Sequence, residues 1–177
     1  MNIWHDISPS RIKPNDFVAY IEIPRGCKSK YELDKETGLL KLDRVLYTST
    51  HYPTNYGFIP RTYADDFDPL DVLVLCSETV YPSTLVQCYP IGFLRMVDSG
   101  LNDEKIIAIP YNDPTYNSYK DISELPDHVF SEIKHFFSVY KTLEQGKPTQ
   151  VEDVQGAQAA QEIIQTAIDS YIEKFCK

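Results

Sequence analysis

The chain has 177 residues, of which 42% are hydrophobic and 24% are charged. These values are typical of a folded globular domain and argue against a disordered chain. We expect one domain over residues 1–177. The net charge of −9 at pH 7 argues against binding to nucleic acid or to an anionic membrane surface.

The cysteines and the N-terminal segment predict a cytoplasmic protein. The four cysteines form no C-x-x-C pair and no zinc-type spacing, which fits reduced thiols. Residues 1–16 contain no apolar segment of the kind found in signal peptides. The longest apolar run, residues 72–76, is far shorter than the roughly 20 residues of a membrane helix.

In chain order, the first two thirds of the sequence predict strands. A β-type run at residues 17–23 ends at Pro24, and residues 30–33 and 39–42 form a hairpin whose loop ends in Gly38. Residues 71–76 predict a strand buried on both faces, and further strands follow at 85–96 and 105–109. Short strands separated by turns are typical of a small barrel or sandwich.

The last third predicts helices. Apolar residues from Val129 to Tyr140 keep helical spacing, and so do those over residues 163–175. Pro126 suits the first position of the earlier helix, and Gly146 suits its end. A closed sheet followed by helices indicates an α+β domain.

The most informative segment is Asp65-Asp66-Phe67-Asp68-Pro69-Leu70-Asp71. Four carboxylates in seven residues repel one another, which is costly unless cations lie between them. In an extended segment Asp66 and Asp68 share a side, and Pro69 bends the chain so that Asp71 can approach them. Carboxylates and waters are the ligands that Mg²⁺ prefers.

Other interpretations of the acidic residues in the chain stay open or fail on particular residues. A charge run is often only a solvated loop. An EF-hand counted from Asp66 would need Gly and Glu where the chain has Asp71 and Ser77. Residues 98–105 taken alone indicate a surface turn. Glu22 shares a strand face with Val18 and Tyr20 and is either buried beside a partner or at a solvated strand end.

Cationic and phenolic side chains complete a possible anion site. Taken singly, each indicates a surface residue whose apolar stem is covered. Together with the carboxylates, they predict cations on one side and phosphate oxygens on the other, since Arg forks and Lys ammonium groups bind phosphate. The residues are Lys30, Arg44, Lys105, Lys141, Tyr52, Tyr56 and Tyr140.

Seven blocks of the sequence together resemble the successive motifs of the soluble (family I) inorganic pyrophosphatases. They occur in the order of that family and span about residues 17 to 156. The blocks are Ile21-Glu22-Ile23-Pro24, Lys30-Tyr31-Glu32, Asp43-Arg44, Tyr52-Pro53-Thr54-Asn55-Tyr56-Gly57, Asp66-Phe67-Asp68-Pro69-Leu70-Asp71-Val72, residues 98–105, and His135-Phe136-Phe137 with Tyr140-Lys141.

The resemblance implies a fold, an activity and an assembly. The fold is α+β, a small five-stranded OB-like β-barrel flanked by two or more helices in the C-terminal third. The activity is hydrolysis of inorganic pyrophosphate to two phosphates, with three or four Mg²⁺ ions and an activated bridging water. The assembly is a homo-oligomer, a homohexamer in the bacterial-type members with chains of this length.

The resemblance also implies a role for each site residue. Asp68 corresponds to the general base. The implied metal ligands are Asp66, Asp71, Asp98 and Asp103, and the implied phosphate-binding residues are Lys30, Arg44, Tyr56, Lys105, Tyr140 and Lys141. Glu22, Glu32 and Tyr52 would support the cluster. Phe67, Ser99 and Val154 depart from the usual family pattern; Val154 is interpreted as a packing residue.

Two other functions compete with this one. A nucleotide or polyphosphate substrate lacks support, because the sequence contains no Walker loop. A non-catalytic OB-type module that binds single-stranded nucleic acid would need a basic groove, which the net charge of −9 opposes.

Overall fold

The computed structural model describes residues 1–146 and 149–177. The two α-helices are α1 (Asp127–Val139) and α2 (Ala157–Phe175), and two short 3-10 turns cover Pro9–Arg11 and Ile122–Glu124. The strands are β1 (Ile12–Lys13), β2 (Asp16–Ile23), β3 (Ser29–Leu33), β4 (Leu40–Val45), β5 (Asn55–Phe58), β6 (Asp71–Val74), β7 (Leu85–Asp98), β8 (Leu101–Pro110) and β9 (Thr149–Gly156).

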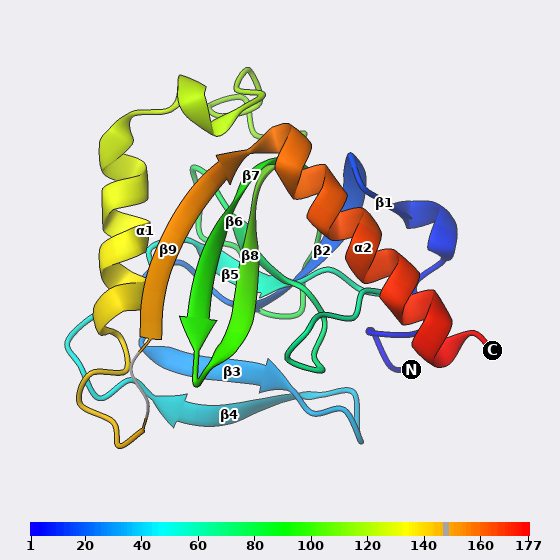
Figure 1. Ribbon diagram of the computed structural model, residues 1–177, viewed down its shortest axis with the longest axis horizontal. Coiled ribbons are helices and arrows are strands. Elements are labelled where there is room, and N and C mark those ends of the chain that lie inside the picture. The colour runs from blue at the N-terminus through cyan, green and yellow to red at the C-terminus, as the bar shows by residue number, and fades with distance from the viewer. Residues whose placement is uncertain (147–148) are drawn as a thin grey trace.

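Five strands close into a barrel. β2 pairs with β5, β5 with β6, β6 with β8, β8 with β7, and β7 returns to β2. The β6–β8 pair is parallel and the other four are antiparallel. β1 and β9 extend the sheet outside this ring (Figure 1). The expected five-stranded OB-like barrel of an α+β protein is therefore confirmed.

Gly57 permits the close approach of β5 to β2. A Cβ atom at this position would lie 1.8 Å from the carbonyl oxygen of Tyr20, a distance no side chain can occupy. Gly57 pairs with Ile21 of β2, and the next residue of β5, Phe58, pairs with Asp71 of β6. The glycine thus brings the three strands that carry Glu22, Tyr56 and Asp71 together.

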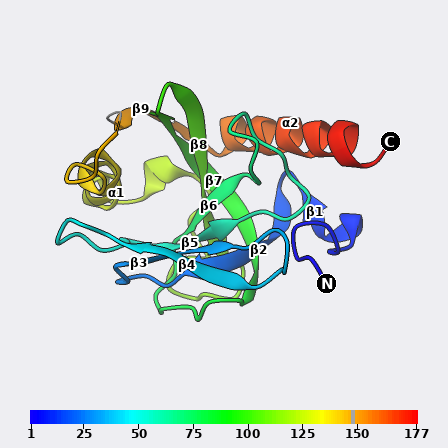
Figure 2. The same ribbon diagram turned by 90° about the horizontal axis from the view of Figure 1, so that it is seen from below.

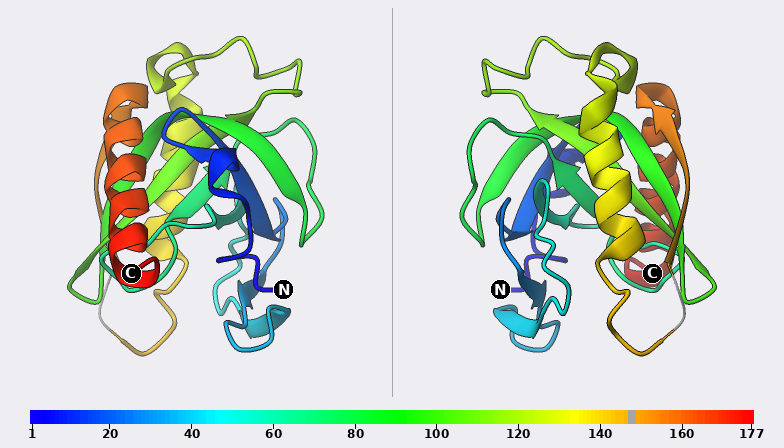
Figure 3. Two further views of the ribbon diagram at one scale, coloured as in Figure 1. Left: turned by 90° about the vertical axis from the view of Figure 1, so that its right-hand side faces the viewer. Right: turned by 90° about the vertical axis from the view of Figure 1, so that its left-hand side faces the viewer.

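The two helices cover different sides of the barrel (Figures 1 and 3). Buried residues of α2, including Ala160 and Ile164, pack in one core cluster with Phe93 of β7. Phe136 and Phe137 of α1 belong to a second cluster. Neither helix of the described residues has the length and apolar character needed to cross a membrane.

The β3–β4 hairpin forms a separate two-stranded sheet beneath the barrel (Figure 2). Leu33 pairs with Leu40 and Gly38 adopts a φ of +76°, which confirms the predicted hairpin and the reason for its glycine. The side chain of Glu22 joins hairpin and barrel by accepting a hydrogen bond from the Leu33 amide at 2.9 Å.

The predicted helix boundaries were partly wrong. α1 ends at Val139 and not at Gly146, and Pro126 lies at its N-cap instead of its first helical position. α2 starts at Ala157, before the predicted residue 163. The Asp121 carboxylate accepts a hydrogen bond from the Ala157 amide at 2.8 Å, and this cap comes from a residue distant in sequence.

Several strand predictions also need correction. β5 and β9 were not predicted, and β6 ends at Val74 instead of residue 76. β8 starts at Leu101, because residues 101–105 pair with residues 94–98 of β7 across a tight turn at Ser99 and Gly100, both with positive φ. Residues 98–105, which taken alone indicated a surface turn, are therefore mainly strand. Val154 packs against the second core cluster, as interpreted from the sequence.

Candidate active site

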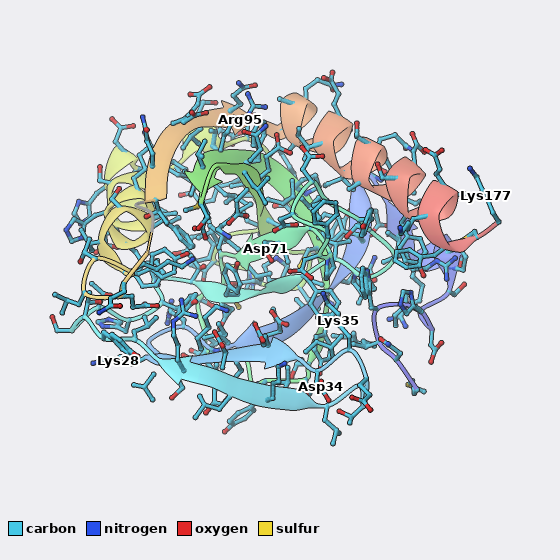
Figure 4. The ribbon with its side chains drawn as sticks, turned by 60° about the horizontal axis from the view of Figure 1, so that its bottom comes forward. Lys28, Asp34, Lys35, Asp71, Arg95 and Lys177 are labelled. Atoms are coloured by element: carbon cyan, nitrogen blue, oxygen red, sulfur yellow. The ribbon has the colours of Figure 1, made fainter. Side chains whose placement is uncertain are left out.

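A pocket of about 520 Å³ lies between the β3–β4 hairpin and the barrel. All the predicted site residues line it except Arg44 and Tyr52. They come from β2, the hairpin, β5, the acidic loop before β6, the β7–β8 hairpin and the end of α1. Figure 4 labels Asp71 on the barrel and Lys35 on the hairpin.

Lys105 is the buried centre of the site. Its ammonium donates hydrogen bonds to Asp71 at 2.8 Å, to both Asp103 oxygens at 3.2 Å and to the Tyr56 hydroxyl at 2.9 Å. The parallel β6–β8 register places Asp71 directly beside Lys105. Asp103 lies two residues earlier on β8 and therefore on the same strand face.

The charges around Lys105 outweigh its burial. Burial alone would lower the pKa of the Lys105 ammonium, but Asp103 and Asp71 raise it well above its ordinary value. The rings of Tyr56 and Phe137, each 5.2 Å from the nitrogen, add cation–π contacts. Lys105 is only 2% exposed, which corrects the interpretation of this lysine as a surface residue.

The acidic loop holds Asp66 close to the same group. Burial raises the pKa of Asp66 to about 7, and the nearby charges of Asp71 and Asp103 add to the shift. Burial likewise raises the pKa of Asp103, although Lys105 opposes the change. The Tyr56 hydroxyl donates a 2.7 Å hydrogen bond to Asp71. An added positive charge would therefore stabilise the ionised form of these carboxylates.

A second part of the site lies where β7 ends beside the end of α1. Lys141 forms an ion pair with Asp98. Burial opposes ionisation of Asp98, but the hydrogen bond and charge of Lys141 prevail and lower its pKa. Burial raises the pKa of the neighbouring Tyr140 phenol, which therefore remains a hydrogen-bond donor at neutral pH.

Glu22 is the most buried carboxylate of the predicted set, at 7% exposure. Burial raises its pKa to about 8, partly offset by the hydrogen bond from the Leu33 amide. Glu22 is thus protonated at neutral pH before any cation binds. Its predicted inward orientation is confirmed, and its partners explain why the hairpin stays against the barrel.

The hairpin contributes the basic wall. Lys30 forms ion pairs with Glu32 at 3.3 Å and Asp43 at 3.0 Å. Arg44, opposite Lys30 in the β3–β4 register, pairs with Asp43 and, at 2.8 Å, with Glu144. Burial alone would lower the pKa of Arg44, but the charges of Glu144 and Asp43 outweigh burial and raise the pKa above its ordinary value. Arg44 does not line the pocket, because these carboxylates hold its guanidinium.

Tyr52 also lies behind the pocket wall. It is 1% exposed, and its ring lies 5.2 Å from that of Tyr56 and 4.7 Å from that of Phe136. Burial raises the pKa of the Tyr52 phenol well above its ordinary value. The structure places it where it supports Tyr56 by packing.

The described residues contain no cluster of three or more His, Cys, Asp or Glu side chains arranged to hold a metal ion. The physical reason is Lys105, whose ammonium occupies the space between Asp71 and Asp103. The donor chemistry nevertheless fits Mg²⁺, because the facing groups are carboxylate oxygens. Burial raises the pKa of Asp66, and the repulsion from Asp71 and Asp103 adds to that rise. A divalent cation here would relieve that repulsion.

Trp4 and Lys35 are among the pocket side chains that the sequence analysis did not assign to the site. Lys35 forms an ion pair with Asp68, and its nitrogen lies 5.4 Å from the centre of the Trp4 ring. Lys35 follows the Lys30-Tyr31-Glu32 block closely, so its position beside the site could have been suspected. Trp4 carried no such signal, because its approach depends on tertiary packing.

The fold and the acidic pocket define a class, proteins with an OB-like barrel and a pocket whose carboxylates suit divalent cations. Comparison with known proteins makes this specific. A family model described as inorganic pyrophosphatase matches residues 19–172. Soluble inorganic pyrophosphatase 2 of Chlamydomonas reinhardtii is 48% identical over 172 residues, 97% of this chain and 89% of that protein. Inorganic pyrophosphatase of Aquifex pyrophilus is 48% identical, covering 95% and 96%.

Solved structures agree. Inorganic pyrophosphatase from Thermus thermophilus superposes with a TM-score of 0.92 at 38% identity, covering 97% of this chain and 99% of that one. The enzyme from Helicobacter pylori gives 0.89 at 40% identity, covering 94% and 98%. The chain belongs to the inorganic pyrophosphatase family. The predicted family and enzyme class are confirmed.

Replacing Glu22 tests the buried neutral carboxylate. Its folded pKa of about 8 exceeds its ordinary 4.5, so folding takes up a proton between those values. Stability of the metal-free wild type is therefore lost as pH rises from 4.5 to 8, by at most about 1.4 kcal/mol per pH unit from this group. Glu22→Gln lacks this loss and should gain relative stability towards pH 8, measured by urea unfolding in EDTA.

The exposed Glu173 on α2 provides the control for that experiment. Glu173→Gln should show the same dependence of stability on pH as the wild type. If Glu22→Gln instead becomes progressively less stable than the wild type towards pH 8, Glu22 is ionised in the folded protein and its assignment here is wrong.

Proposed function

We propose that this pocket hydrolyses inorganic pyrophosphate to two phosphates with the help of bound Mg²⁺. The observation that carries the proposal is the set of convergent groups, with Asp71 and Asp103 paired to Lys105 and Asp66 close to both carboxylates on one side of the pocket. Pyrophosphate is a compact, highly charged anion, and cations held by carboxylates attract such an anion even in an acidic protein. Family membership supports the same substrate.

Asp66, Asp71, Asp98 and Asp103 would hold three or four Mg²⁺ ions during turnover. Bound Mg²⁺ would lower the pKa of a coordinated water and neutralise phosphoryl oxygens. Lys105 would keep Asp71 and Asp103 oriented towards the pocket while remaining positively charged itself. Glu22 and Glu32 would support this arrangement from β2 and β3, and Tyr52 would support it by packing behind Tyr56.

The chain's other polar groups would bind and orient the substrate. Lys30, Lys141 and Tyr140 line the pocket and can donate to the leaving phosphate, and Tyr56 can do the same beside Lys105. Arg44 would need to release Glu144 or Asp43 to reach a phosphate. A phosphate would compensate for this release, because it offers the guanidinium two parallel hydrogen bonds.

Asp68 would accept a proton from the attacking water. Its side chain is half exposed at the pocket wall, and one carboxylate oxygen accepts a hydrogen bond from Lys35. The other oxygen accepts no hydrogen bond from any described residue. A carboxylate held on one side and open on the other suits a general base.

The assembly and location are proposed on the same family resemblance. We expect a homo-oligomer in the cytoplasm, specifically a homohexamer. Each chain would form a single catalytic domain over residues 1–177.

The direct test is phosphate release from pyrophosphate at neutral pH. We expect two phosphates per pyrophosphate with Mg²⁺, and loss of release when EDTA removes the cation. ATP and tripolyphosphate are the comparison substrates. A folded sample with no Mg²⁺-dependent release, or one that prefers a comparison substrate, would contradict the proposal.

Two substitutions separate a metal ligand from a base. Asp71→Asn removes a carboxylate charge from the proposed metal site, so Mg²⁺ binding should weaken and some activity should return at high Mg²⁺. Asp68→Asn should bind the tightest ion almost normally yet lose kcat by roughly a hundred-fold, the usual scale for removing a general base. Calorimetry for Mg²⁺ beside kcat measures both. Rescue of Asp68→Asn by Mg²⁺, without rescue of Asp71→Asn, would reverse the two assignments.

A further inference from the structure

Asp68 is held from outside the acidic loop by a lysine on the hairpin. Lys35 lies in the turn after β3, and its ammonium donates to one oxygen of Asp68. Figure 4 shows Lys35 on the side of the hairpin that faces the barrel and Asp71. Both partners are about half exposed, at 52% and 51%. A pair so exposed contributes little to stability, so its value would have to lie in geometry.

The Lys35 side chain does not move as freely as its exposure suggests. Its nitrogen lies 5.4 Å from the centre of the Trp4 ring, a cation–π contact that restricts the chain. Its backbone carbonyl accepts a hydrogen bond from the Asn2 side chain at 3.2 Å. The N-terminal segment therefore fixes both the backbone and the ammonium of Lys35.

Trp4 is in turn anchored to the segment that leads to the acidic loop. Its indole N–H donates to the Thr62 carbonyl at 2.9 Å, and its own carbonyl accepts from the Arg61 amide at 2.9 Å. The ring is 5% exposed and lies against His5 and Tyr63. One buried aromatic ring thus connects the N-terminus, the hairpin turn and the approach to Asp68.

The acidic loop supplies the other restraint on Asp68. The Ala64 amide donates to the Asp68 carbonyl at 2.9 Å, and the Asp68 amide donates to Asp66 at 3.2 Å. Phe67 between them adopts a φ of +68°, an unfavourable conformation for an aromatic residue that these hydrogen bonds hold in place. The backbone is fixed by the loop and the carboxylate by Lys35.

We propose that Lys35 is a positioning residue for Asp68 and that Trp4 holds Lys35 in place. By engaging one oxygen of the carboxylate, Lys35 turns the other towards the pocket, where the proposed reaction needs an acceptor for the proton of the attacking water. The inference rests on the proposed role of Asp68. It makes the N-terminal segment part of the catalytic apparatus although it contributes no residue to the chemistry.

The kinetics of Lys35→Met test the positioning role of Lys35. We expect kcat to fall by roughly tenfold, the scale of a misplaced catalytic group, while KM for Mg²⁺-pyrophosphate stays within about twofold. Lys35→Arg keeps a cationic donor and should restore at least about half of kcat. Lys177→Met, which removes another exposed ion pair just beyond the C-terminal end of α2, is the control and should match the wild type. A raised KM with unchanged kcat would make Lys35 a substrate ligand and overturn the proposal.

A double variant distinguishes this inference from the function beneath it. If Lys35 acts through Asp68, Lys35→Met in an Asp68→Asn background should cost no further activity. If the two residues acted independently, the losses of activity from the two substitutions would multiply. Full activity of Asp68→Asn would refute the proposed base itself. A large loss in Asp68→Asn beside wild-type kcat in Lys35→Met would refute only the positioning role.

Trp4 is the single tryptophan of the chain, so its fluorescence reports on the contact directly. Lys35→Met removes the cation over the ring and should change the emission of the metal-free protein, whereas Lys177→Met should not. Trp4→Leu should lower kcat in the same direction as Lys35→Met with KM again nearly unchanged, in a sample whose unfolding transition remains cooperative. Unchanged emission in Lys35→Met, or wild-type kcat in folded Trp4→Leu, would contradict the proposal.

Discussion

The arrangement of the pocket depends on one buried ammonium group. An unpaired charge under a barrel would cost several kcal/mol, so Lys105 stays charged only because Asp71 and Asp103 face it. The parallel pairing of β6 with β8 sets this contact, and Gly57 sets the approach of β5 that brings Tyr56 to the same nitrogen. Removing the lysine would leave buried carboxylates facing one another without a counter-charge.

The need to pair each charge with an opposite charge also applies to the less buried groups around the pocket. Lys141 pairs with Asp98, and Lys30 pairs with Asp43 and Glu32, so these carboxylates meet a cation of the chain itself. Asp66 and Glu22 have weaker compensation, and burial raises the pKa of both. The site is thus balanced for more positive charge than the protein supplies, which is the electrostatic basis for proposing divalent cations at Asp66.

The family resemblance implied the closed barrel, since the strand pattern alone left a barrel or a sandwich. Sequence patterns predicted several of the strands, the hairpin with Gly38 and the acidic loop, because each depends on local periodicity or turn chemistry. They failed where tertiary contacts decide. The Asp121 cap moved the start of α2, and pairing with β7 formed the polar strand β9. The membership of most site residues followed from motifs. The burial of Lys105 and the approach of Trp4 did not, since both depend on segments distant in sequence.

Asp66, Asp71 and Asp103 would together hold a divalent cation beside Lys105. Mn²⁺ replaces Mg²⁺ at oxygen ligands and scatters X-rays anomalously, so a crystal grown with Mn²⁺ locates the ion without reference to activity. We expect an anomalous peak within coordination distance, about 2.2 Å, of oxygens from these three aspartates. A fully occupied Mn²⁺ ion found elsewhere in the pocket, with Asp71 and Asp103 still bound only to Lys105, would contradict it.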